Sequence, residues 1–203
     1  MTSARRTTVA ALCAGALLAS CATSAPDGPA LVWSDEFAGA AGSAPDAASW
    51  QPVSGGHGWG NGELQCYTDS RDNSLVDGKG YLVISARSTP GHACADGTTN
   101  DYTSARLITQ GLRSFQYGTF EMRAKVPTGV GAWPAFWALG QDHETAGWPA
   151  SGEIDVTEVL GREPRVSHGS VHGPRADGTP YTVTGKQESP VDLGAGFHVY
   201  SAT

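Results

Sequence analysis

Residues Gly152 to Glu158 read G-E-I-D-V-T-E and place three carboxylates, Glu153, Asp155 and Glu158, within one short segment. Two carboxyl groups held on one surface can cleave a glycosidic bond, one as the nucleophile and the other as the acid and base. The same residue types also suit a solvated acidic strand end, or a calcium site built from carboxylates. The segment taken alone leaves all three interpretations open.

The residues between the acids favour an extended strand, because most of them are β-branched. Side chains alternate faces along a strand, so Glu153 and Asp155 would share a face while Glu158 pointed into the core. A one-residue bulge around Val156-Thr157 would return Glu158 to the acidic face. Two long glutamate side chains leaning together could then approach the carboxyl separation of about 5–5.5 Å that retention of configuration requires. We therefore predict a bulged strand.

Short strands separated by Gly, Pro and Asp turns are predicted elsewhere in the chain. The expected strands are Tyr81–Ala86, Thr119–Val126, Trp133–Leu139 and Val166–His172. Thr119–Val126 alternates between apolar and charged residues, and Val166–His172 places two histidines on one face. With 27 glycines and 12 prolines, the chain is expected to form an all-β sandwich.

The length of 203 residues suits one domain, and the formal net charge of -7 argues against binding to nucleic acid or to an anionic membrane surface. The first thirty residues do not match this β pattern. Arg5 and Arg6 are followed by an apolar stretch, Val9–Leu18, that is too short to span a bilayer.

That stretch ends in Leu18-Ala19-Ser20-Cys21, which resembles a bacterial lipobox. We expect residues 1–20 to be a lipoprotein-type signal peptide, and residues 21–30 to be a lipidated Cys21 with a short tether. An ordinary signal peptide is the alternative. The protein is thus expected to be exported, and either lipid-anchored at the bacterial cell surface or secreted, with no membrane contact except through the lipid.

Export implies an oxidising compartment, so the remaining cysteines bear on the fold. Cys66 and Cys94 would either form a disulfide, closing a loop over the strand near Tyr81–Arg87, or stay as two buried thiols.

Several segments in a fixed order resemble the signature of glycoside hydrolase family 16, in its branch of bacterial endo-β-1,3-glucanases, or laminarinases. They are L-V-W-S-D-E-F (Leu31–Phe37), G-W-G-N-G-E-L-Q (Gly58–Gln65), W-P-A-F-W (Trp133–Trp137), G-W-P-A-S-G (Gly147–Gly152) before Glu153, H-G-S-V-H-G (His168–Gly173) and F-H-V-Y (Phe197–Tyr200).

The resemblance implies a β-jelly roll of the concanavalin-A-like group, whose concave sheet forms the sugar cleft. Relatives of this kind continue through further strands beyond the position of Thr203. Residues 31–203 are therefore expected to be a partial family 16 catalytic domain, with the jelly roll incomplete at the C-terminus.

By the same resemblance, Glu153 is the nucleophile, Glu158 the general acid/base, and Asp155 an assisting acid between them. The substrate-binding residues implied are Asn61, Arg106, Trp133, Trp137, Trp148 and His172. Aromatic faces suit the C–H faces of sugar rings, although tryptophan in a sandwich also packs in cores, and Arg106 could form a surface ion pair instead.

The resemblance implies no cofactor for catalysis, and one structural calcium to which Glu36 and the carbonyl of Gly80 would contribute. His168 and His172 are a weak zinc signal, because no third ligand lies nearby in sequence.

The function expected is endo-acting hydrolysis of β-1,3-glucan with retention, by a monomer. The alternatives are a β-1,3-1,4-glucanase of the same family and a non-catalytic, lectin-like β-glucan-binding protein. Agar and carrageenan hydrolases of the same fold would need cleft residues that the sequence does not show.

Overall fold

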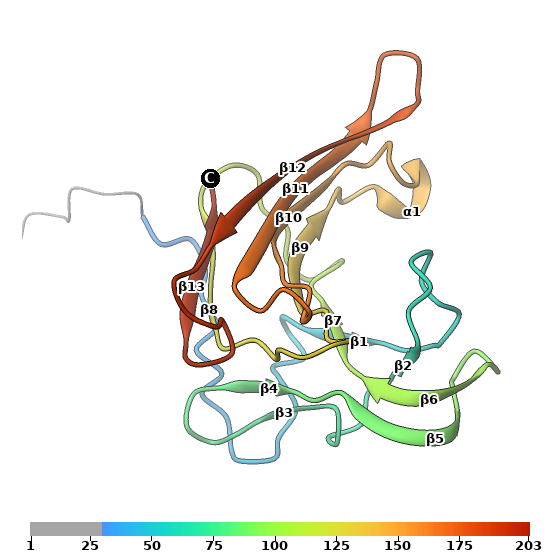
Figure 1. The fold of residues 1–203 in the computed structure, drawn as a ribbon, viewed down its shortest axis with the longest axis vertical. Helices are drawn as coiled ribbons and strands as arrows, with labels where there is room; N and C mark the ends of the chain where they lie inside the picture. The colour runs from blue at the N-terminus through green and yellow to red at the C-terminus, as the bar shows by residue number, and fades with distance from the viewer. Residues whose placement is uncertain (1–29) are drawn as a thin grey trace, which may run out of the picture. The chain divides into compact units, whose positions relative to one another are not determined.

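The computed structural model of the protein describes residues 30–203 (Figure 1). The expected signal peptide (1–20), Cys21 and most of the tether lie outside the described residues. Residues up to Asp35 form a unit separate from Glu36–Thr203, and the description below concerns the second unit. Within the described part, no helix has both the length and the apolar character that crossing a bilayer would require.

The described residues form thirteen strands and one helix of a single turn, α1 (His143–Ala146), which confirms the all-β expectation. The strands are β1 (Gln51–Val53), β2 (Gln65–Tyr67), β3 (Ser74–Val76), β4 (Leu82–Ile84), β5 (Arg87–Ala93), β6 (Thr99–Ser104), β7 (Arg106–Ile108), β8 (Phe120–Ala124), β9 (Ala135–Leu139), β10 (Glu153–Glu158), β11 (Val166–Pro174), β12 (Pro180–Glu188) and β13 (His198–Ala202).

Each predicted strand appears, with altered ends. The strand expected at Tyr81–Ala86 is shortened to β4, because its partner β3 offers three residues for pairing. In β8 the apolar residues face inward and the charged residues are exposed, as the alternation predicted.

Four strands form an antiparallel sheet in the order β12-β11-β10-β9, which Figure 1 shows as adjacent ribbons. The carboxylate strand β10 is therefore central, paired with β9 on one side and with β11 on the other. A central strand has both edges hydrogen-bonded, so the backbone that carries the acids is held from both sides.

The predicted bulge is present in β10. Asp155 pairs with Trp137 of β9, yet Thr157 pairs with the very next β9 residue, Phe136. One residue of β10 is thus unmatched, and Val156 and Thr157 both turn to the face opposite Asp155. The bulge brings Glu158 back to the acidic face.

The bulge residues are fixed by the core beneath them. The Thr157 side chain is fully buried, with its hydroxyl 2.7 Å from that of Ser167 on β11. Val156 packs against a buried cluster that lies against β8 and β13. The members of this cluster are Val126, Val159, Leu193 and Tyr200, with Met122 and Ala124 at its margin. Core packing therefore sets the register of the acidic face.

Candidate active site

The three carboxylates occupy one face of the sheet, as their register shows. Glu153 pairs with His172, Asp155 with Ser170 and Glu158 with His168, all on β11. Asp155 is buried, with 5% of its surface exposed, whereas the two glutamates are half-buried. The arrangement leaves two accessible acids on either side of a buried one.

Each glutamate accepts a hydrogen bond from a tryptophan. Trp148 Nε1 donates to Glu153 Oε2 over 2.8 Å, and Trp133 Nε1 donates to Glu158 Oε1 over 2.9 Å. Both indoles remain about half exposed, so their faces stay accessible to a ligand. The Trp148–Pro149 peptide bond is cis. The sequence predicted these tryptophans near the acids but not their role as donors that orient the carboxylates.

The buried Asp155 is held by His172, whose Nε2 lies 2.9 Å from Asp155 Oδ2. The other ring nitrogen, Nδ1, lies 2.9 Å from the hydroxyl of Thr182 on β12. An imidazole that donates from Nε2 accepts from that hydroxyl at Nδ1, so β12 orients the ring. His172 thus lies beside the acids, as expected, and contacts Asp155 in particular.

Burial raises the pKa of Asp155 to about 6, and the negative charges of Glu153 and Glu158 add to this effect. The hydrogen bond and the charge of His172 act in the opposite direction. Asp155 therefore holds a proton more firmly than an ordinary aspartate and can serve as a hydrogen-bond donor to its neighbours.

This raised pKa predicts how stability depends on pH. Between about pH 4 and pH 6 the folded protein keeps the Asp155 proton while the unfolded chain releases it, so the free energy of unfolding falls as the pH rises. Asp155→Asn should abolish this decline and, above pH 6, should raise the free energy of unfolding by about 1–3 kcal/mol. Denaturant unfolding of both proteins from pH 4 to 7 measures the difference.

The matched control is Asp177→Asn, at an exposed turn away from the acids. This variant should not show the same change in the pH dependence of stability. If Asp155→Asn lost stability at pH 7, or kept the wild-type slope between pH 4 and 6, the raised pKa would be refuted.

Arg106 of β7 lies between two tryptophan rings. Its Cζ is 4.5 Å from the ring centre of Trp137 and 5.2 Å from that of Trp59. Since Trp137 pairs with Asp155, the guanidinium borders the acidic face. The structure thus places Arg106 and Trp137 at the site, and adds Trp59, which the sequence analysis did not single out although it lies in the quoted G-W-G-N-G-E-L-Q segment.

Asn61 is exposed and its side-chain amide lies 3.3 Å from Glu63 Oε1. The other oxygen of Glu63 accepts from Gln65 Nε2 and from the Tyr67 hydroxyl, both over 2.6 Å. Burial, together with this bond to Glu63, raises the pKa of Tyr67 well above its usual value. Glu63 thus anchors the base of the loop and accepts a hydrogen bond from Asn61, whose side chain remains exposed to solvent.

The two residues expected to bind calcium lie together, with the Glu36 carbonyl oxygen 3.3 Å from where a Cβ on Gly80 would be. Calcium takes about six to eight oxygen ligands, so these two supply only part of a site. In residues 30–203, one group of three potential ligands lies close enough to share a metal, namely Glu153, Asp155 and His172.

Cys66 and Cys94 form a disulfide, with their Cα atoms 5.5 Å apart. It joins β2 to the turn after β5, the first of the two alternatives that the sequence left open.

Two accessible glutamates around a buried aspartate, with aromatic rings on the same face of a β-sheet, define a site of the glycoside hydrolase kind. The family model "Glycosyl hydrolases family 16" matches residues 65–203, and the chain belongs to that family. The expected membership and the jelly-roll sandwich are thereby confirmed.

Three similar proteins support the assignment. The chain is 43% identical over 173 residues to a beta-glucanase of Rhodothermus marinus, covering 84% of this chain and 58% of the relative. It is 44% identical over 174 residues to a glucan endo-1,3-beta-glucosidase of Cryptopygus antarcticus, covering 84% of this chain and 61% of the relative. The solved laminarinase catalytic domain of Thermotoga maritima superposes with a TM-score of 0.72 at 40% identity, covering 85% of this chain and 68% of that one. The chain therefore spans about three fifths of the first two relatives.

Proposed function

We propose that the protein is an endo-acting hydrolase of β-1,3-glucan that retains the anomeric configuration. The observation that carries the proposal is the shared face of Glu153 and Glu158, each fixed by an indole N–H. The similar proteins named above, a laminarinase and a glucan endo-1,3-beta-glucosidase among them, support β-1,3-glucan as the substrate.

In the proposed reaction, a Glu153 carboxylate oxygen attacks the anomeric carbon, and the bond from that carbon to the leaving oxygen breaks. The leaving oxygen takes the proton of Glu158. Glu158, now a carboxylate, then removes a proton from water, whose oxygen attacks the same carbon and releases Glu153. Two displacements at one carbon give net retention, and no cofactor takes part.

Asp155 supports both steps from between the glutamates. Oxygens of Glu153 and Asp155 and a nitrogen of His172 lie within 4.8 Å of one another, so the charge of Glu153 acts on Asp155 while His172 contacts Asp155 directly. With a pKa of about 6, Asp155 holds its proton in mildly acidic solution and offers a donor to the nucleophile before attack and after release.

Incubation of the full chain with laminarin, lichenan and agarose, followed by assay of reducing ends, tests the proposal. Faster release of reducing ends from laminarin than from lichenan supports β-1,3 specificity. Faster release from lichenan supports the mixed-linkage alternative. Binding of laminarin without any product would favour a lectin-like protein and overturn the proposal. NMR of the first product determines the anomeric configuration.

We also propose export through the N-terminal segment, with lipidation of Cys21, on the basis of the lipobox-like sequence. A structural calcium near Glu36 and Gly80 is proposed from the closeness of the two residues. We also propose that the protein is a monomer.

A further inference from the structure

The loop of residues 55–63, here named the glycine-rich loop, carries Trp59 to the edge of the site and exposes Asn61. Five of its nine residues are glycine, and Trp59 itself has a left-handed φ of 51°. Glycine gives the backbone wide freedom, so ordering such a loop costs more entropy than ordering other chains. Contacts from outside the loop must hold it.

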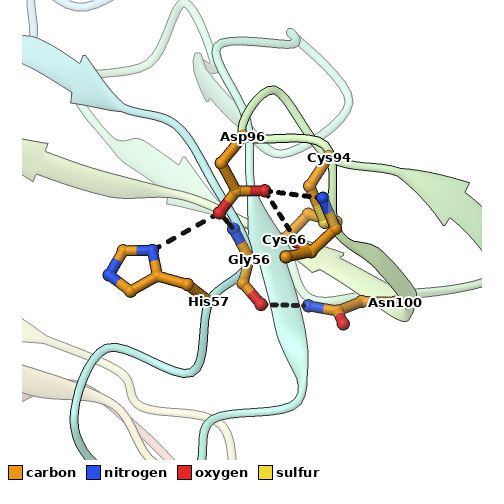
Figure 2. Close-up of polar contacts among 7 residues, drawn as sticks. Gly56, His57, Cys66, Cys94, Asp96 and Asn100 are labelled. Carbon is orange, nitrogen blue, oxygen red and sulfur yellow. Dashed lines mark hydrogen bonds and ion pairs between the residues drawn. A yellow bond between two sulfur atoms is a disulfide. The ribbon is translucent and has the colours of Figure 1, made fainter.

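One set of these contacts lies at Gly55, whose backbone pairs with that of Tyr67, and a second set lies at Gly56 (Figure 2). Its N–H donates to Asp96 Oδ2 over 2.7 Å, and its carbonyl accepts from Asn100 Nδ2 over 2.9 Å. The neighbouring His57 Nδ1 lies 3.4 Å from the same Asp96 oxygen. Both backbone polar groups of Gly56 are thus occupied by side chains some 40 residues away in sequence.

The approach at Gly56 leaves no room for a side chain. A Cβ there would lie 2.3 Å from Cys94 Sγ, 2.6 Å from Asn100 Nδ2 and 2.8 Å from Thr98 Oγ1. Its φ lies outside the left-handed region, so space and not backbone conformation requires glycine. Cys94 and Thr98 belong to the turn that follows β5, and the disulfide from Cys94 to Cys66 joins this turn to β2. We name Asp96, Asn100 and the disulfide the clasp.

Ring contacts lead from the clasp to the acids. The rings of His57 and Trp59 have centres 4.3 Å apart, and Trp59 lies against Arg106. Arg106 in turn lies against Trp137, the partner of Asp155 in the sheet. A displacement of the loop at Gly56 would therefore move the ring of Trp59, which borders the acidic face through Arg106.

We propose that Asp96 is a positioning residue, which through the clasp holds the glycine-rich loop so that Trp59 and Asn61 bind a glucosyl unit remote from the bond that is cleaved. The sugar-binding part rests on the proposed function. The clasp then makes the protein favour long glucan chains over short ones, because Arg106 and Trp137 separate Trp59 from Asp155, and a short chain bound at the acids would not extend to Trp59.

Asp96 makes hydrogen bonds within its own turn as well as to the distant Gly56. A second turn in the chain has the same local hydrogen bonds and so provides a control for them. In Asp96-Gly97-Thr98, the Asp96 Oδ1 accepts from Thr98 N over 3.1 Å and from Thr98 Oγ1 over 2.6 Å. In Asp177-Gly178-Thr179, the Asp177 Oδ1 accepts the equivalent bonds over 3.0 and 2.6 Å. These bonds hold the pKa of both carboxyls below the usual value, with further bonds from Gly56 and His57 acting on Asp96 alone.

The test compares Asp96→Ala with Asp177→Ala in the full chain. Without ligand, hydrogen exchange of the peptide covering residues 55–63 should be at least about tenfold faster in Asp96→Ala and unchanged in Asp177→Ala. With laminari-oligosaccharides of increasing length, Asp96→Ala should raise the KM of the longest about tenfold, while kcat stays within about twofold. Short oligosaccharides should show no difference.

Gly56→Ala provides a second variant, since it opposes the same close approach and leaves Asp96 intact; it should reproduce both changes. Unchanged exchange in the loop for both variants would overturn the clasp. Faster exchange with a uniform loss on short and long substrates would overturn the positioning role. If the wild-type chain cleaves no glucan, the proposed function fails, yet the exchange experiment still decides whether the clasp holds the loop.

Discussion

Replacement of Glu153 by alanine is expected to reduce hydrolysis of laminarin by about 10⁴-fold or more, because no other group can form the covalent bond to the anomeric carbon. The fold should persist, because Glu153 is half-buried and its negative charge repels that of Asp155. Steady-state assay of reducing ends and thermal unfolding measure the two expectations.

Azide sharpens this test, because it can attack the anomeric carbon without help from a base. In Glu153→Ala it would enter from the vacated side and displace the leaving group once, so an activated β-glucoside should yield an α-glycosyl azide. Glu144→Ala, on the exposed helix α1, is a matched control expected to hydrolyse normally. Hydrolysis by Glu153→Ala near the wild-type rate would refute the nucleophile assignment.

Replacement of Glu158 by alanine is expected to have a different signature. Hydrolysis of laminarin should fall by about 10³-fold or more, because the leaving sugar oxygen then departs without a proton. A substrate with an acidic leaving group needs no such proton, so Glu153 should still be glycosylated rapidly while water reacts slowly. Rapid kinetics should show a burst, and mass spectrometry should detect the glycosyl-enzyme.

Azide should react with this intermediate and give a β-glycosyl azide, because two displacements restore the configuration. Trp133→Phe, which removes the indole donor to Glu158 and keeps an aromatic face, should lose far less activity than Glu158→Ala. An α-azide from Glu158→Ala, or no burst with the activated substrate, would show that the roles of the two glutamates have been assigned wrongly.

Much of the acidic strand was predictable because its information is local. β-branched residues between the acids predicted the strand, and the need to bring Glu158 to the face of Glu153 predicted the bulge. Both follow from the two-residue period of a strand, which depends on neighbours in sequence.

The surroundings of the acids were less predictable, because they depend on residues distant in sequence. Trp133 lies 25 positions from Glu158, and the sequence does not indicate whether its indole offers an N–H or a ring face. The contact between Trp59 and Arg106 depends on a loop path with left-handed residues, for which the hydrophobic pattern gives no signal. The clasp at Gly56 depends likewise on a close approach between two turns.

The bulge in β10 makes the active site sensitive to the parity of a residue count. Glu153 and Glu158 are five positions apart, an odd number, and share a face only while one position goes unmatched. If Val156 lost its place in the core and the strand straightened, every residue after Asp155 would change faces at once, and the second glutamate would leave the substrate side. An apolar side chain in the core, Val156, thus determines which face of the sheet Glu158 occupies. A repacked core could therefore inactivate the protein with all three acids unchanged.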